Sequence, residues 1–353
     1  MENQQGAKMS KFIKRSLGVV ALAAAAFVVS SAAIAADDFK GKTAKIVIPY
    51  GPGGTYDNYS QAFAKHLGKH IPGKPNVIVQ HMPGAGGVKA MNWAYTVMQK
   101  DGLNMLIPLD NTILNQLLRP EKMRYDARNF TWLGSSNQTN MVLVVASSTG
   151  VNTWQDLRKR KSIGASAGTG SFDFIIQRLT SGLLKFELKT VTGYKGSSAT
   201  SHAVQQGEAD LNANNWLTYA SRQPHWFTGD KPFARAVLQV GVFKDPALPK
   251  SVPLISELLT DALDKKVVDF IGVAGLLGRG LVLPPKVSGK MVKTMRAAYA
   301  AMNADPVFEA ELKKRKLRLI PSKGEEIQKI VINAVNSASP EVIKRAREVI
   351  FRK

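Results

Sequence analysis

The sequence predicts an α/β protein with two domains and mostly parallel sheets. Short runs rich in Val and Ile alternate with stretches of helical length, which is typical of this architecture. Two of these runs, residues 45–48 (KIVI) and 77–80 (VIVQ), lead directly into glycine-rich turns at residues 49–55 (PYGPGGT) and 83–87 (PGAGG). A buried strand that ends in such a turn and then a helix is a recurrent element of α/β folds.

Seven segments are expected to be strands. They are residues 45–49, 77–80, 104–107, 141–146, 162–165, 189–192 and 234–241. Helices are expected to begin near Asp57, Lys89, Asn152, Ser171 and Ser198, and to cover residues 290–302, 306–318 and 324–352.

The first 35 residues are expected to be a secretory signal peptide. Four basic residues precede an apolar run at residues 17–29, and residues 33–35 (AIA) form a small-residue cleavage pattern that ends at Ala35. The apolar run is shorter than the ~20 residues needed to span a membrane. We therefore expect a periplasmic protein cleaved near Ala35, whose translation starts at Met1 or Met9.

The amino-acid composition excludes several kinds of binding site and several kinds of partner. The chain has no cysteine, which excludes disulfides, thiolate metal ligands and a lipid-modified cysteine at the mature N-terminus. Its formal net charge of +22 would fit nucleic acid, an anionic surface or acidic ligands. Export argues against nucleic acid. The densest basic run, residues 313–316 (KKRK), lacks interleaved aromatic residues and is read as a solvated helix face.

The expected domains are two lobes. The composition changes at residues 131–139 and again at the proline-punctuated residues 245–253. We therefore expect lobe one to contain residues 36–138 and 246–353, and lobe two to be the inserted segment 139–245. The mature chain is expected to be a monomer.

The first glycine-rich turn is a candidate anion site. Backbone N–H groups at a glycine turn before a helix point into open space, and the helix dipole adds positive potential there. Gly53, Gly54 and Thr55 are the residues placed to hold a carboxylate, and Asp57 would cap the start of the helix.

Eight segments in order carry a resemblance to a known family. They are residues 49–57 (PYGPGGTYD), 77–87 (VIVQHMPGAGG), 101–108 (DGLNMLIP), 123–135 (MRYDARNFTWLGS), 153–171 (TWQDLRKRKSIGASAGTGS), 192–198 (TGYKGSS), 207–215 (GEADLNANN) and 245–257 (DPALPKSVPLISE). Together they cover nearly all of the mature chain. In these segments the chain resembles the substrate-binding receptors of tripartite tricarboxylate transporters, the Bug-type periplasmic receptors.

The resemblance implies a two-lobed periplasmic binding protein of type II with a ligand cleft between the lobes and no enzymatic chemistry. It implies capture of a small organic carboxylate for a tripartite membrane permease, or a sensing role if there is no permease. Besides Gly53, Gly54 and Thr55, the ligand-binding residues that it implies are Ser166, Gly168, Thr169, Gly170, Ser171, Tyr194, Asn214 and Asn215. Asn214 stands where the family usually has Asp, which bears on the carboxylate that is bound. Trp216 is either an aromatic wall of the cleft or a core residue.

A secreted serine esterase is the alternative. Residues 164–168 fit the G-x-S-x-G nucleophile pattern with Ser166 as nucleophile, and Asp210 and His225 follow in the chain order of an α/β-hydrolase. Against it, Gly168 and Gly170 delay the helix that such a nucleophile needs at once. The sequence indicates no cofactor, because it contains no P-loop and no complete dinucleotide fingerprint. It also indicates no metal: His66 and His70 lack a third ligand nearby and are expected at an exposed helix end.

Overall fold

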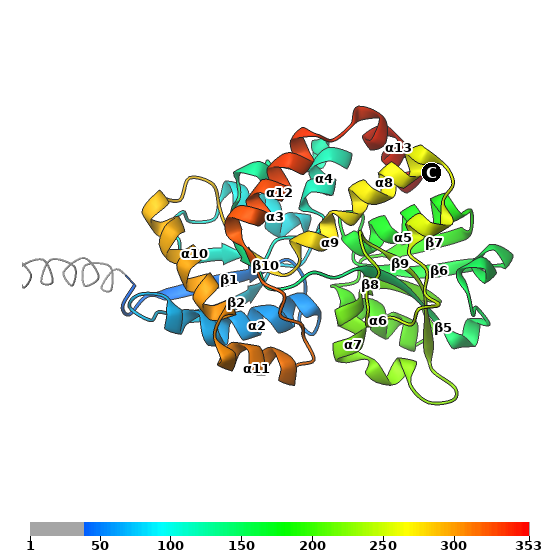
Figure 1. Ribbon diagram of the computed structural model, residues 1–353, viewed down its shortest axis with the longest axis horizontal. Helices are drawn as coiled ribbons and strands as arrows, with labels where there is room; N and C mark the ends of the chain where they lie inside the picture. The colour runs from blue at the N-terminus through cyan, green and yellow to red at the C-terminus, as the bar shows by residue number, and fades with distance from the viewer. Residues whose placement is uncertain (1–38, 353) are drawn as a thin grey trace, which may run out of the picture.

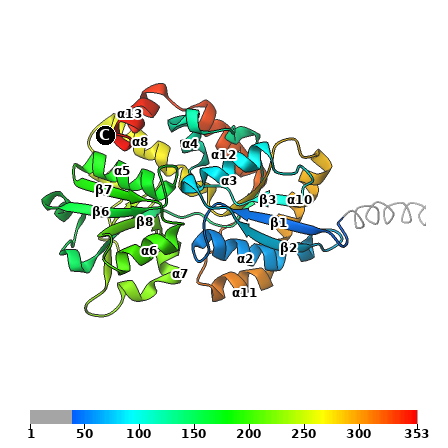
Figure 2. The same cartoon turned by 180° about the vertical axis from the view of Figure 1, so that it is seen from behind.

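The computed structural model describes residues 39–352, and the predicted signal peptide lies outside the described residues. The described chain forms two lobes side by side, each built on one sheet with helices on both faces (Figures 1 and 2). The six-stranded sheet of lobe one has the order β11-β4-β10-β3-β1-β2, and the five-stranded sheet of lobe two has the order β7-β6-β8-β5-β9. None of the described helices is both long and apolar enough to cross a membrane.

Lobe one packs helices on both faces of its sheet. Its strands are β1 (Thr43–Ile48), β2 (Asn76–His81), β3 (Asn104–Leu106), β4 (Thr131–Ser135), β10 (Gly280–Leu283) and β11 (Ser322–Lys323). Its helices are α2 (Thr55–Leu67), α3 (Val88–Thr96), α4 (Thr112–Leu118), α9 (Ala274–Leu277), α10 (Gly289–Asn303), α11 (Pro306–Lys314) and α12 (Gly324–Asn336). The core between the sheet and α2, α10 and α11 contains Phe63, Tyr299 and Phe308. The opposite face packs on α3 and α12 through Met91 and Ile327.

Lobe two has the same layered plan. Its strands are β5 (Met141–Ala146), β6 (Lys161–Ser166), β7 (Glu187–Thr192), β8 (Leu211–Asn215) and β9 (Ala234–Val240). Its helices are α5 (Phe172–Leu184), α6 (Ser197–Gln205), α7 (Trp216–Arg222) and α8 (Ala262–Gly272), and the last helix, α13 (Pro340–Ile350), also packs here. One face of the sheet packs on α5, and the other packs on α6 and α7.

The α/β fold class is confirmed, but the expectation of mostly parallel sheets is wrong. Strands β1, β2 and β3 pair in parallel, as do β6, β7 and β8, whereas β10 and β5 pair antiparallel with their neighbours. The predicted strands are all present, but β4, β8, β10 and β11 were missed. The helix expected over residues 324–352 is two helices, because Pro340 begins α13 after a break.

The chain returns to lobe one later than the expected boundary after residue 245. It first crosses between β4 and β5, and the sheet of lobe one resumes only at β10. Between these points Val267 and Ile271 of α8 lie in the core of lobe two, and Val349 and Ile350 of α13 join them there. Helix α13 therefore brings the end of the described chain back across to lobe two, as Figure 1 shows.

The C-terminal helix is a structural part of lobe two, and we expect Ile350→Ala to show it. Ile350 is fully buried against the α5 core, so the truncation should lower the free energy of unfolding by about 2–5 kcal/mol. Val307→Ala is the control, since Val307 is 58% exposed and should change stability by less than about 0.5 kcal/mol. Urea unfolding of both variants checks this, and equal midpoints for the two would contradict the packing role.

Candidate functional site

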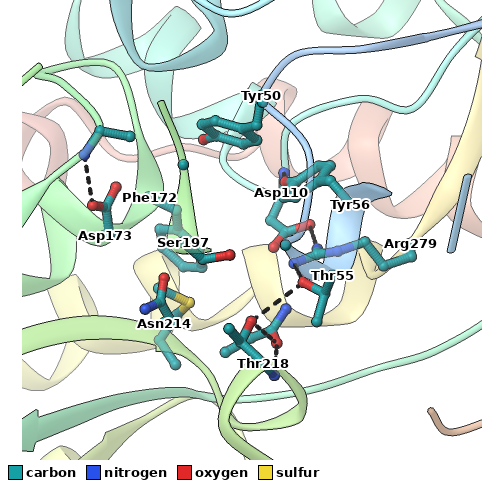
Figure 3. Close-up of a pocket in the computed structure, with 16 residues that line it drawn as sticks. Tyr50, Thr55, Tyr56, Asp110, Phe172, Asp173, Ser197, Asn214, Thr218 and Arg279 are labelled. Atoms are coloured by element: carbon teal, nitrogen blue, oxygen red, sulfur yellow. Dashed lines mark hydrogen bonds and ion pairs between the residues drawn. The ribbon is translucent and has the colours of Figure 1, made fainter. Parts of the chain in front are cut away.

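A small cavity lies between the lobes, where strand ends and helix starts of both lobes meet. Lobe one lines it with Tyr50, Gly51, Gly54, Thr55, Tyr56, Asp110 and Arg279; lobe two lines it with Met141, Ala167, Phe172, Asp173, Gly196, Ser197, Asn214, Asn215 and Thr218 (Figure 3). The centres of water molecules can occupy about 40 Å³ of it, so the lobes are close together around it.

Two helices from different lobes begin at this cavity with their N-termini against each other. Gly54 precedes α2 and Gly196 precedes α6, and neither helix start is capped by a side chain. A Cβ at Gly54 would lie 2.5 Å from Ser197 Oγ, which shows how closely the two helix starts approach. The first N–H groups of each helix have no intrahelical partner. Two positive helix ends therefore face one small space.

The glycine loop before α2 is held in place from both sides. Asp57 Oδ2 accepts a hydrogen bond from Gly53 N–H at 2.9 Å, and its Oδ1 lies 3.0 Å from His81 Nε2 on β2. Across the cleft, Gly51 N–H donates to the Lys195 carbonyl at 2.7 Å. Asp57 thus restrains the loop through Gly53, while Gly54 itself stands at the N-cap position of α2.

A buried ion pair forms the lobe-one wall of the cavity. Arg279, at 3% exposure, donates through Nη1 to Asp110 and through Nη2 to Thr55 Oγ1 at 3.2 Å. Its guanidinium lies 3.8 Å from the ring centroid of Tyr56, a cation–π contact. Burial raises the pKa of Asp110, and Arg279 opposes that rise. Thr55 Oγ1 also lies 3.3 Å from Thr218 Oγ1, which joins the two lobes.

The lobe-two wall carries a second buried acid. Asp173, in the first turn of α5, accepts a hydrogen bond from Ala167 N–H at 2.9 Å through Oδ2. Burial raises the pKa of Asp173, and hydrogen bonds from its neighbours offset part of that rise. Burial also raises the pKa of Tyr50, and the charges of Asp173 and Asp110 raise it further, so this phenol lies near both acids.

Comparison with known proteins reveals the fold. No protein-family model and no curated protein matches this chain. Among solved structures, the periplasmic binding protein BugD superposes with a TM-score of 0.71 at 18% identity, covering 88% of this chain and 98% of its own. The chain has the fold of a periplasmic binding protein. An R. palustris protein solved with adipate and MatC from Rhodopseudomonas palustris with bound malate each give a TM-score of 0.68 at 19% identity. Both alignments cover 88% of this chain. They cover 98% of the protein solved with adipate and 100% of MatC.

Within this periplasmic-binding-protein fold, the predicted ligand-binding residues divide into two groups. Gly54, Thr55, Asn214 and Asn215 line the cavity, and Gly53 lies next to it. Tyr194 does not line it; this side chain borders a neighbouring groove and donates from its hydroxyl to Glu208 at 3.2 Å.

The predicted lobe-two loop at residues 166–171 does not face the cavity, except at Ala167. Ser166 and Ser171 are fully buried, and Gly168 N–H donates to Ser166 Oγ at 3.3 Å. The Gly170 carbonyl accepts from Asn111 and Asn115, and Thr169 Oγ1 accepts from Arg119 at 2.9 Å; these donors are in or beside α4 of lobe one. The loop therefore joins the two lobes, and the N–H groups of Ala167, Gly168 and Ser171 are already hydrogen-bonded within lobe two.

The sequence reasoning missed most of the side chains around the cavity. They are Tyr50, Asp110, Met141, Phe172, Asp173, Thr218 and Arg279. Asp110 could have been found, because it follows β3 at the edge of the sheet where ligands bind in α/β folds. Trp216 lies in the lobe-two core against Phe227 and is absent from the cavity lining, so the core alternative holds for it.

The esterase alternative finds no support in the geometry at Ser166. Ser166 Oγ lies 3.3 Å from Ser171 Oγ, and the described residues show no hydrogen bond between Ser166 and a histidine. Asp210 is engaged elsewhere: its Oδ2 accepts from Ile163 N–H at 2.7 Å and its Oδ1 pairs with Arg160 at 2.9 Å. The fully buried Ser166 therefore lacks the base that would activate it.

Within residues 39–352, no group of three or more potential metal ligands comes together. The expectation that His66 is exposed is wrong: it is 3% exposed, because it packs against Phe308. His70 Nε2 lies 3.1 Å from Asp305 Oδ2 at the lobe-one surface.

Proposed function

We propose that this protein is a periplasmic receptor that captures a small organic carboxylate in the cavity between its lobes. The observation that carries the proposal is the meeting of the α2 and α6 N-termini, uncapped and from different lobes, at Gly54 and Ser197. Each helix start carries about half a positive elementary charge. Bringing two of them together is unfavourable unless an anion lies between them, and a carboxylate there would accept hydrogen bonds from both.

The same arrangement would make closure depend on the ligand. In an open form each helix start would be hydrated separately, whereas the closed form lets one carboxylate contact both lobes. The ligand therefore stabilises the closed form by its differential affinity. In this proposal Gly54 and Thr55 bind the carboxylate from lobe one, and Ser197, through its N–H, and Asn215 bind it from lobe two. Asn214 faces the rest of the ligand, and the loop at residues 166–171 holds the lobes together through α4.

Two further observations support a place in the Bug-type receptor family. The eight sequence segments occur in the family order, and the fold is shared with BugD and with proteins solved with adipate and malate. A member would be exported by the segment before Ala35, would act without catalysis or a cofactor, and would deliver its ligand as a monomer to a tripartite tricarboxylate-type permease.

A thermal-shift screen of residues 36–353 tests this function. At a ligand concentration 100 times Kd, binding stabilises the native state by about 2.7 kcal/mol, which should raise Tm by several degrees. The panel consists of mono-, di- and tricarboxylates, and each acid is paired with its neutral amide as the control. We expect at least one acid to raise Tm while its amide does not. A panel in which no acid raises Tm more than its amide would refute the carboxylate proposal.

A further inference from the structure

Asp173 is a buried acid at the cavity that no cation of the protein pairs with. Asp173 is 8% exposed, and it forms no ion pair with any of the described residues. Its known donors are neutral: Ala167 N–H bonds one oxygen, and the Ser171 and Ser166 hydroxyls lie close enough to stabilise the charged form. The one arginine that lines the cavity, Arg279, is already paired with Asp110.

The cavity lining carries a net negative charge, and that charge lies at the end where Asp173 is found. The ionisable side chains that line it and are charged in their ordinary forms are Asp110, Asp173 and Arg279, which leaves one uncompensated negative charge. Figure 3 shows Asp173 and Asn214 on the side away from the Arg279–Asp110 pair, with Phe172 and Ser197 between them. The carboxylate position at the helix starts and the acidic position at Asp173 are thus separate parts of one cavity.

The surroundings of Asp173 favour a cation. Phe172 and Tyr50 line the same cavity, and aromatic faces attract cationic groups when water is excluded. Asn214 Nδ2 is directed to Thr200 and the Tyr219 hydroxyl, at 3.5 and 3.4 Å, so its Oδ1 remains as an acceptor. Asn214 lines the same cavity as Asp173, and Figure 3 draws both on the side away from Arg279. Burial of an ionised carboxyl is costly without a partner of opposite charge, and a cationic ligand group would supply that partner.

We propose that the ligand carries a cationic nitrogen in addition to its carboxylate, and that Asp173 binds this nitrogen. The inference rests on the proposed carboxylate-binding function and narrows it to zwitterions such as amino acids and other amino carboxylates. The carboxylate lies between the starts of α2 and α6, and the ammonium group lies between Asp173, Asn214 and the aromatic side chains.

Matched pairs of ligands test this. Calorimetry on residues 36–353 compares β-alanine with propionate, 4-aminobutyrate with butyrate, and glutamate with glutarate, and thermal shift extends the set to the common amino acids and their des-amino acids. We expect the amino member of at least one pair to bind at least tenfold more tightly, which corresponds to about 1.4 kcal/mol. Tighter binding by the des-amino members throughout would overturn the inference and leave the proposed function standing. No binding by any acid would overturn both.

The Asp173→Asn variant, measured with the same matched pairs of ligands, is the second test of this inference. The amide keeps an acceptor for Ala167 N–H but removes the charge, so the preference for the amino member should fall to near onefold while affinity for the des-amino acid is kept. Asp261→Asn is the matched control: Asp261 caps α8 by accepting from Asp264 N–H at 2.8 Å and is outside the cavity lining, so the preference should persist. An unchanged preference in Asp173→Asn would overturn the inference.

The unaltered protein offers a readout that does not depend on folding of a variant. Tyr50 and Tyr219 are the titratable groups that interact with Asp173 from neighbouring elements, and both remain neutral because burial raises the pKa of each phenol. The pKa of Asp173 is also raised by burial. Lowering the pH from 7 towards 4 should therefore reduce the amino-to-des-amino affinity ratio. Dicarboxylate binding that strengthens over the same range, with no amino preference at pH 7, would instead indicate a neutral Asp173 that donates to a second carboxylate.

Discussion

Replacing Asp110 with Ala should lower the free energy of unfolding of the ligand-free protein by about 3–5 kcal/mol. The variant leaves the Arg279 guanidinium, at 3% exposure, without its carboxylate partner. The remaining contacts, to Thr55 Oγ1 and the Tyr56 ring, are neutral and cannot compensate a buried charge. Arg279 Nε already has no partner among the described residues, so the side chain has little capacity to form new bonds where it is.

Urea unfolding measures this loss against two controls. Asp110→Leu combined with Arg279→Met removes both charges and should be less destabilising than Asp110→Ala, because no unpaired charge stays buried. Glu187→Ala removes the partner of Lys161 in a surface pair whose side chains are 87% and 68% exposed, and should cost less than about 1 kcal/mol. If Asp110→Ala lowered the free energy of unfolding no more than Glu187→Ala does, the Arg279 guanidinium would have to be hydrated in the variant, and the buried-charge argument would be wrong.

The strands that could be predicted are those in which local composition matches burial. The run of residues 141–146 (MVLVVA) is buried throughout and was predicted as β5. Strand β8 is equally buried, but its sequence, LNANN, contains three asparagines. Asn212 accepts from the Tyr219 hydroxyl at 2.7 Å, and Asn215 caps α7 through Thr218. Since these partners come from tertiary packing, composition alone could not indicate this strand.

The candidate site shows a similar limit. The loops at residues 51–55 and 166–171 share the local pattern of a strand, glycines and a helix; that pattern predicted an anion site at the first loop, and the family resemblance implied ligand-binding residues in the second. The first loop lies at the cavity, whereas the second docks on α4, and that difference depends on how the lobes pack. The ion pair joins Asp110 to Arg279 across 169 positions of sequence, which no local pattern reveals.

Gly54→Val should reduce affinity for the preferred carboxylate by on the order of 100-fold, a coupling of about 3 kcal/mol between closure and binding. A Cβ at Gly54 would lie 2.5 Å from Ser197 Oγ, so valine would hold the α2 and α6 starts apart. The backbone at Gly54, with φ −86° and ψ 179°, accepts any residue, so lobe one itself should not be strained. The ligand-free Tm should therefore change little while binding is lost.

Three further variants separate closure from a general loss of stability. Gly289→Val is the control, because a Cβ at Gly289 would meet nothing within 4 Å, and its affinity should be unchanged. Gly54→Ala introduces a smaller obstacle than valine, and pairing it with Ser197→Ala removes the Oγ that it would meet, so the double variant should bind more tightly than Gly54→Ala alone. Calorimetry gives the affinities. If Gly54→Val kept full affinity, one carboxylate could not be shared by the two helix starts, since a ligand held by lobe one alone would not require their close approach.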